Sequence, residues 1–175
     1  MDIQQSEMAG TTPVLGQGIL SPEALRAANI NPATGLATDY LNHFNEVMML
    51  MEMLPDMPDC AEDVLDWAPA DYAEHFANSS FKDKDLAVLA WQAVPHQVRA
   101  HLVTVVMQIE AEVGRAQGLL RDGVDSNSCR AVARLATECI KPLIVAASSA
   151  IHGQVESEED YQDESVQAGV DALFD

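Results

Sequence analysis

Four polar residues close to position 40 have the types and spacing that metal binding or catalysis requires. They occupy positions i, i+3, i+4 and i+7 of a predicted helix: Asp39, Asn42, His43 and Glu46. This spacing places the four side chains on one face of the helix. Carboxylate and imidazole groups one turn apart bind metal ions in helical bundles. Asp39, His43 and Glu46 are therefore candidate metal ligands, and a solvated polar face is the alternative interpretation.

Asp39 and Asn42 also fit a phosphatase. An amide one turn from a carboxylate can orient a water molecule for attack on an acyl phosphate. The sequence contains no glycine loop for phosphate binding and no Gly-x-Ser-x-Gly nucleophile turn. We therefore predict no cofactor and favour a protein without enzymatic activity. A phosphoprotein phosphatase is the enzymatic alternative.

A methionine cluster follows on the same predicted helix. It consists of Met48, Met49, Met51, Met53 and Met57. Thioethers can bind Cu(I), but they more commonly fill a core or form an adaptable interface. Met48 and Met51 share the predicted core face, whereas Met49 and Met53 lie outside it. This second pair is a candidate surface for self-association into a homo-oligomer.

The net charge of −19 is unevenly distributed along the chain. Residues 27–81 contain ten acids and no Lys or Arg, whereas residues 82–152 contain seven acids and eight Lys or Arg residues. Because phosphate backbones attract positive charge, we predict no direct binding to nucleic acid. The role of the acidic segment at 55–74 is left open by the sequence.

Helices must position these residues, because no strand-like alternation appears in the sequence. Ser21 and Pro22 favour a helix start. Apolar residues at helical spacing predict further helices at about 38–54, 83–94, 96–121 and 128–152, with Pro142 kinking the last one. One or two short helices are expected around Trp67, Tyr72 and Phe76. The predicted core positions of the longest helix are Val98, Leu102, Val105, Ile109, Val113, Ala116 and Leu120.

The predicted fold is all-α, a helical bundle of about three long helices plus short ones. We expect a disordered N-terminal segment at 1–20, the bundle at 21–152 and an acidic tail at 153–175. The first residues lack the basic and apolar parts of a secretory signal. The most apolar run, residues 143–151, has about half the length needed to cross a bilayer. We therefore predict a cytoplasmic protein that does not associate with membranes.

The predicted tail combines strong acidity with apolar residues at its end. Residues 153–175 contain eight acids and no Lys or Arg, a composition typical of a solvated chain. Yet Val166, Val170, Leu173 and Phe174 fall at helical spacing. Such an amphipathic turn is expected to order on a partner, or else to fold back onto the bundle.

The end of the tail resembles a docking peptide of chemotaxis proteins. Residues 167–174 read Gln-Ala-Gly-Val-Asp-Ala-Leu-Phe. They are similar to the peptide, approximately Ser-Gln-Ala-Glu-Ile-Asp-Ala-Leu-Leu, by which flagellar-switch proteins of the FliM type bind the response regulator CheY, except that Gly169 replaces the family's acid. The CheZ-type chemotaxis phosphatase carries a related terminal peptide on an all-helical body. The resemblance implies these protein-binding residues: Gln167, Val170, Asp171, Leu173 and Phe174.

Together these observations predict a bacterial helical interaction protein that acts in signalling. Its tail would dock a protein partner, with the receiver domain of a response regulator as the candidate. One alternative is a CheZ-like receiver phosphatase that uses Asp39 and Asn42, although the helical body lacks that family's catalytic motif. The other alternative is a metal-binding bundle that uses Asp39, His43 and Glu46.

Overall fold

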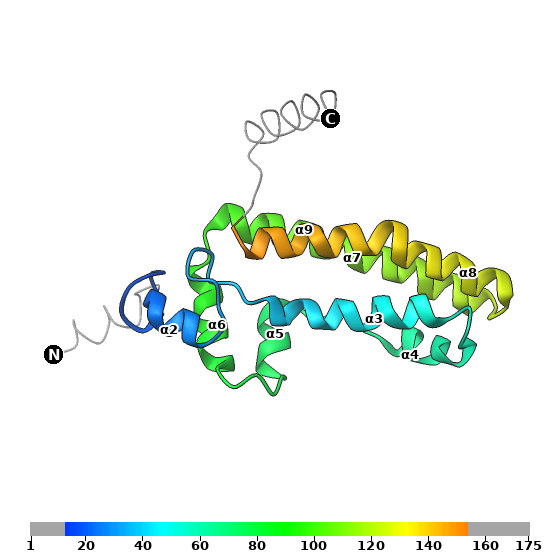
Figure 1. Ribbon diagram of the computed structural model, residues 1–175, viewed down its shortest axis with the longest axis horizontal. Coiled ribbons are helices and arrows are strands. Elements are labelled where there is room, and N and C mark those ends of the chain that lie inside the picture. The colour runs from blue at the N-terminus through cyan, green and yellow to red at the C-terminus, as the bar shows by residue number, and fades with distance from the viewer. Residues whose placement is uncertain (1–12, 154–175) are drawn as a thin grey trace, which may run out of the picture.

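The computed structural model of the protein describes residues 13–153, within which every regular element is a helix (Figure 1). The α-helices are α2 (Pro22–Ala27), α3 (Asn42–Met53), α4 (Ala61–Asp66), α5 (Tyr72–Ala77), α6 (Lys84–Ala93), α7 (His96–Asp122), α8 (Ser126–Leu135) and α9 (Lys141–Ile151). Short 3₁₀ turns cover Gly18–Leu20, Thr38–Leu41 and Pro58–Cys60, and a π-helical turn covers Ala136–Ile140. The predicted all-α class is confirmed.

The longest elements form an antiparallel hairpin, in which α7 packs against the combined α8–α9 helix while α3 lies along it (Figure 1). The apolar stripe predicted for α7 lines the core of this hairpin. Its buried members are Leu102, Val105, Ile109, Val113, Ala116 and Leu120. Val98, at the start of the stripe, is half-buried. The 4-3-4 spacing of apolar residues therefore identifies the packed face of the longest helix.

The last helix widens just before Pro142. The Lys141 N–H donates to the carbonyl of Ala136, five residues back, which is the bonding pattern of a π turn. Pro142 has no N–H, and in a regular α-helix its ring would clash with the carbonyl of Glu138. A wider turn relieves that clash while the helix continues. The kink expected at Pro142 thus takes the form of a π turn.

α6 faces the core differently from the sequence prediction. Apolar spacing over residues 83–94 predicts Leu86, Leu89 and Ala93 (or Val94) as core positions, but the fully buried residues of α6 are Ala87 and Ala90, with Val94 following. The cause is a close approach of the backbone at Gly35, where an added Cβ would lie 3.3 Å from the Ala90 carbonyl oxygen. Only small side chains fit on that face of α6, so the leucines pack at its edges.

The described chain begins earlier than the predicted bundle. Leu15 packs against the core and Leu20 is fully buried, so residues 13–20 do not follow the prediction of disorder up to residue 20. Ser21 caps α2 as predicted, because its side chain accepts the N–H of Ala24. Asn31 before Pro32 favours a second helix start by sequence, but the structure has a turn there, in which the Asn31 side chain accepts the N–H groups of Ala33 and Thr34.

Candidate functional site

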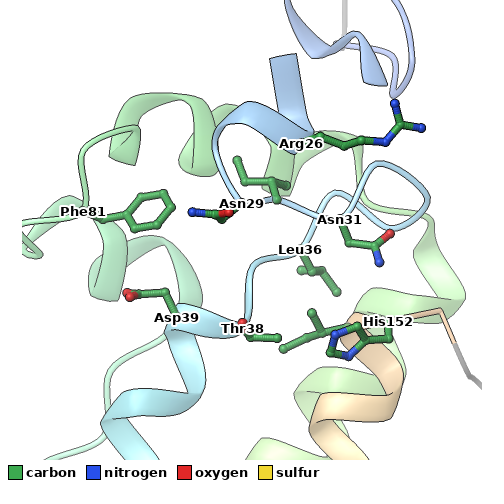
Figure 2. A pocket seen from close by; sticks show the side chains of 10 residues that line it. Arg26, Asn29, Asn31, Leu36, Thr38, Asp39, Phe81 and His152 are labelled. Atoms are coloured by element: carbon green, nitrogen blue, oxygen red, sulfur yellow. The ribbon is translucent and has the colours of Figure 1, made fainter. Parts of the chain in front are cut away.

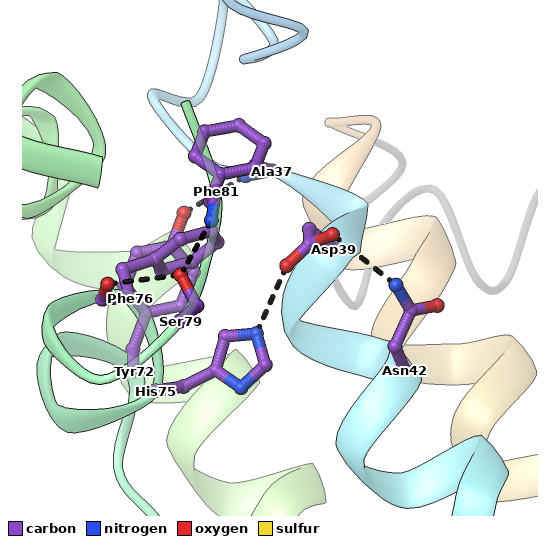
Figure 3. Close-up of polar contacts among 8 residues, drawn as sticks. All are labelled: Ala37, Asp39, Asn42, Tyr72, His75, Phe76, Ser79 and Phe81. Atoms are coloured by element: carbon purple, nitrogen blue, oxygen red, sulfur yellow. Dashed lines mark hydrogen bonds and ion pairs between the residues drawn. The ribbon is translucent and has the colours of Figure 1, made fainter. Parts of the chain in front are cut away.

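Asp39 is the centre of a small polar network at the start of α3 (Figure 3). Its Oδ1 accepts a hydrogen bond from the Asn42 amide at 3.2 Å, and its Oδ2 lies 3.0 Å from Nε2 of His75 on α5. A carboxylate only accepts, so this nitrogen of His75 donates. His75 is largely buried, and its ring packs edge-on against Phe76. The network therefore joins two helices and leaves Asp39 about one-third exposed, with 34% of its side chain accessible.

His43 bonds outside this network and stabilises the chain around Trp67. Its ring stacks on the Trp67 indole, with 4.7 Å between the ring centroids. Its Nε2 lies 2.8 Å from the carbonyl oxygen of Ala68, and the Trp67 indole N–H donates to the carbonyl of His43 itself. Because a carbonyl only accepts, Nε2 of His43 carries a proton and has no lone pair for a metal ion. This geometry gives His43 a structural role.

The three candidate metal ligands do not assemble into a site. Asp39 bonds to His75, His43 bonds to Ala68, and Glu46 lies exposed on the outer side of α3. Across residues 13–153, no group of three or more His, Cys, Asp or Glu side chains could hold a metal ion. Asp39 lies in the 3₁₀ turn Thr38–Leu41, whereas His43 and Glu46 lie within α3, so the three side chains have different surroundings despite their i, i+4 and i+7 spacing.

A cleft of about 530 Å³ opens beside Asp39 (Figure 2). It lies between the turn after α2, the start of α3, the loop before α6 and the end of α9. Its polar and aromatic lining includes Arg26, Asn31, Thr38, Asp39, Phe81 and His152. Leu36 and Ile151, both buried, form part of its apolar base. The cleft thus combines groups of both charges with an apolar base.

The end of α9 is fixed in place next to this cleft. Thr34, the buried polar residue of the core, donates its hydroxyl hydrogen to the Ile151 carbonyl at 2.7 Å. Gly153 then adopts a φ of +81°, a conformation that readily accommodates glycine and ends the helix. The predicted docking residues Gln167, Val170, Asp171, Leu173 and Phe174 lie outside the described residues, beyond this helix end.

Two buried tyrosines connect the site to its surroundings. The Tyr72 hydroxyl accepts the N–H of Ala37 at 2.9 Å, and the Tyr40 hydroxyl donates to the carbonyl of Ala70 at 2.9 Å. Burial raises the pKa of both phenols above the usual value, so both stay protonated at neutral pH. Apolar spacing places Tyr40 beside the core stripe of residues 38–54 and Tyr72 in the packing of the short helices, but it does not reveal their polar role or the pairing of His75 with Asp39. Nothing in the local spacing signals contacts between residues 30 or more positions apart.

Comparisons with known proteins add no family to this description: no family model, no curated protein and no solved structure matches the chain. None of the helices within residues 13–153 is long and apolar enough to cross a membrane.

Proposed function

We propose that this protein is a helical interaction protein that binds a protein partner through residues 166–175. The candidate partner is the receiver domain of a response regulator. The observation that supports the proposal is the fixed end of α9. Ile151 is 1% exposed and its carbonyl is bonded to Thr34, so the segment that follows is attached to a rigid point of the bundle.

The composition of the terminal segment supports the same function. Val170, Leu173 and Phe174 supply an apolar face at helical spacing, suited to a groove on a partner. The eight acids of residues 153–175 favour a partner with basic residues around that groove, because complementary charge accelerates encounter and selects the partner. The bundle acts as the scaffold that carries the binding segment.

Truncation after Glu164 tests this function. Binding of the full chain and of the truncated chain to a purified receiver domain is measured by isothermal titration calorimetry, and both melting temperatures are recorded. We expect the truncated chain to lose binding and to keep its melting temperature. A fall of several degrees in melting temperature would show that the segment belongs to the core of the bundle, contrary to the proposal.

Two variants with the full chain length separate apolar contact from charge. Leu173→Ser combined with Phe174→Ser removes apolar surface and keeps every acid, so binding should be lost. Asp171→Asn keeps the apolar face but removes one acid. Binding should therefore weaken and should depend less on salt concentration. Unchanged binding by the double serine variant would contradict docking through the apolar face.

A phosphatase acting on the same partner is the second candidate. The contact between Asn42 and Asp39 favours it, since an amide held by a carboxylate at the surface can orient a water molecule. Asn42→Ala should then abolish dephosphorylation of the receiver domain and leave its binding intact. Asn45→Ala, three residues further along α3, is the matched control.

A further inference from the structure

The outward face of α7 carries an apolar stripe of its own, separate from the stripe that α7 buries. Its members follow a 4-4-3-4 spacing along the helix: Val103, Met107, Ala111, Gly114 and Gly118. The two large members are well exposed, Val103 by 44% and Met107 by 63%. Between positions 100 and 114 of α7, no exposed residue is Lys, Arg, Asp or Glu. Because the outer face of a surface helix is usually charged or polar, this stripe marks an interaction surface.

A hollow lies at the C-terminal end of the stripe. It has a volume of about 450 Å³ and is lined by Arg115, Gly118, Leu119, Arg121 and Asp122. Positions 115, 118, 119 and 122 have the spacing of the four residues that form a hole for an incoming side chain in paired helices. A Cβ added at Gly114 or Gly118 would meet no atom of the described chain within 4 Å beyond the backbone of α7 itself. The two glycines therefore leave space that a side chain from outside can fill.

The stripe is complementary to itself when a second copy runs in the opposite direction. The spacing of Met107, Ala111, Gly114 and Gly118 is 4-3-4, which reads the same from both ends. Antiparallel pairing therefore places Met107 of one copy over Gly118 of the other, and Ala111 over Gly114. The large side chain meets the hollow, and the small residues meet where the two helices cross. One face thus supplies both sides of the contact, as a two-fold interface requires.

The charge distribution favours the same face for a contact between two copies. Because the chain has a net charge of −19, two copies repel each other. Residues 82–152, which contain all of α7, have seven acids and eight Lys or Arg residues, so repulsion is weakest there. A charged partner would find no opposite charge along residues 100–114, whereas a second copy needs none.

We infer that α7 is the interface of a homodimer, in which the α7 helices of two copies pack antiparallel through this stripe. α7 has 27 residues, which gives a length of about 40 Å, and a helix is about 10 Å wide. The contact therefore buries about 400 Å² on each copy, less than the area typical of stable interfaces. The dimer is accordingly weak and reversible. It does not depend on the binding proposed for residues 166–175.

Sedimentation equilibrium of the full chain, from about 10 µM to about 1 mM, tests this inference. We expect monomers at the lower concentration and dimers at the higher one. Raising the salt concentration from about 10 mM to about 150 mM should strengthen association, because it screens the repulsion between the copies. Monomers at every concentration would overturn the inference. Loss of the dimer on truncation after Glu164 would also overturn it, since the terminal segment would then join the copies.

Substitution of exposed methionines locates the interface. Met107→Glu places a carboxylate opposite the hollow of the second copy and should lower the association constant about tenfold or more. Met49→Glu is the matched control, because Met49 is 56% exposed on α3 and the substitution adds the same charge. Equal effects of the two substitutions would overturn the assignment to α7.

An exchange of Met107 and Gly118 tests the antiparallel register. Gly118→Met alone sets two methionines against each other, and Met107→Gly alone leaves the hollow empty, so each should weaken the dimer. The two substitutions together restore one large and one small residue at each contact, so the association constant should return to within about threefold of that of the unmodified chain. Melting temperatures at low concentration report whether α7 itself is intact. A double variant that associates no better than either single variant would overturn this pairing.

Discussion

The two halves of this bundle are held together by different chemistry. The hairpin of α7 and α8–α9 packs through aliphatic and small side chains, such as Ile109, Val113 and Ala147. The part from α3 to α6 packs through aromatic rings, of which Tyr72 stacks on Trp91 with 4.7 Å between centroids. This second part also depends on side chains that bond to backbone atoms of distant segments.

The charge distribution explains the difference. Residues 27–81 have ten acids and no Lys or Arg, so no ammonium or guanidinium group of their own can link their loops. Neutral donors replace them: the Tyr40 hydroxyl, the Trp67 indole N–H and the Gln117 amide all donate to backbone carbonyls. Gln117 contributes from α7 and bonds the carbonyls of both Val64 and Trp67. Within residues 13–153, the acidic layer is thus built on a nearly neutral hairpin without ion pairs between them.

The largest expected effect comes from the aliphatic half. Ile109→Ala removes a fully buried side chain from the centre of α7. We expect the free energy of unfolding to fall by about 3 kcal/mol, from lost apolar burial and the cavity left behind. Urea denaturation measures this change. Met107→Ala, two positions away and 63% exposed, is the control and should change stability by less than about 0.5 kcal/mol.

A smaller effect is expected from the polar links of the acidic half. Tyr72→Phe leaves the buried N–H of Ala37 without its acceptor, so we expect a loss of about 1–2 kcal/mol in unfolding free energy. Tyr40→Phe removes the donor to the carbonyl of Ala70, a half-buried residue that water can reach, and should cost less. If both substitutions proved neutral in urea denaturation, aromatic packing alone would hold this half together.

The smallest effect concerns the boundary between the halves and depends on pH. Burial raises the pKa of the Glu110 carboxyl, so in the folded state this group holds its proton to higher pH than in the unfolded chain. Stability therefore falls as pH rises from the unfolded-state pKa through the folded-state pKa, and it stays reduced at neutral pH. Glu110→Gln removes this penalty.

Thermal unfolding at several pH values checks this sign. Glu110→Gln should raise the melting temperature at pH 7, and the gain should disappear below about pH 4, where the unfolded-state carboxyl is also protonated. Glu112→Gln is the matched control. It removes the ion pair with Arg115 and should bring no gain at pH 7. If both variants raised the melting temperature at pH 7, the cause would be the lower net charge and not the burial of Glu110.

Local features of the chain were predictable from the sequence. Ser21 before Pro22 marks the start of α2, and the stripe through Leu102 and Ile109 defines α7, which runs from His96 to Asp122 against a predicted 96–121. These features depend on neighbours within one or two turns. The cap of α8 shows the limit of such reasoning, because the sequence favours Ser126 or Asn127 as the cap residue, whereas Asp125 caps the helix in the structure.

Long-range features were not predictable. The face that α6 buries depends on how closely Gly35 approaches Ala90, and the sequence of α6 contains no information about that distance. His75 bonds to Asp39 across 36 positions, and His43 bonds to Ala68 across 25. The spacing along the chain selected these residues as candidates, but the partners of Asp39 and His43 are set by the packing of α4 and α5 against α3.

The π turn at Ala136–Ile140 also sets the rotational phase of the last helix. A π turn holds one residue more than an α turn, so it absorbs an extra residue that would otherwise rotate everything beyond it by about 100°. If the same residues formed a regular α-helix, Ile144 and Ile151 would leave the core, and the Ile151 carbonyl would no longer meet Thr34. The π turn thus determines the direction in which the chain leaves the bundle at Gly153.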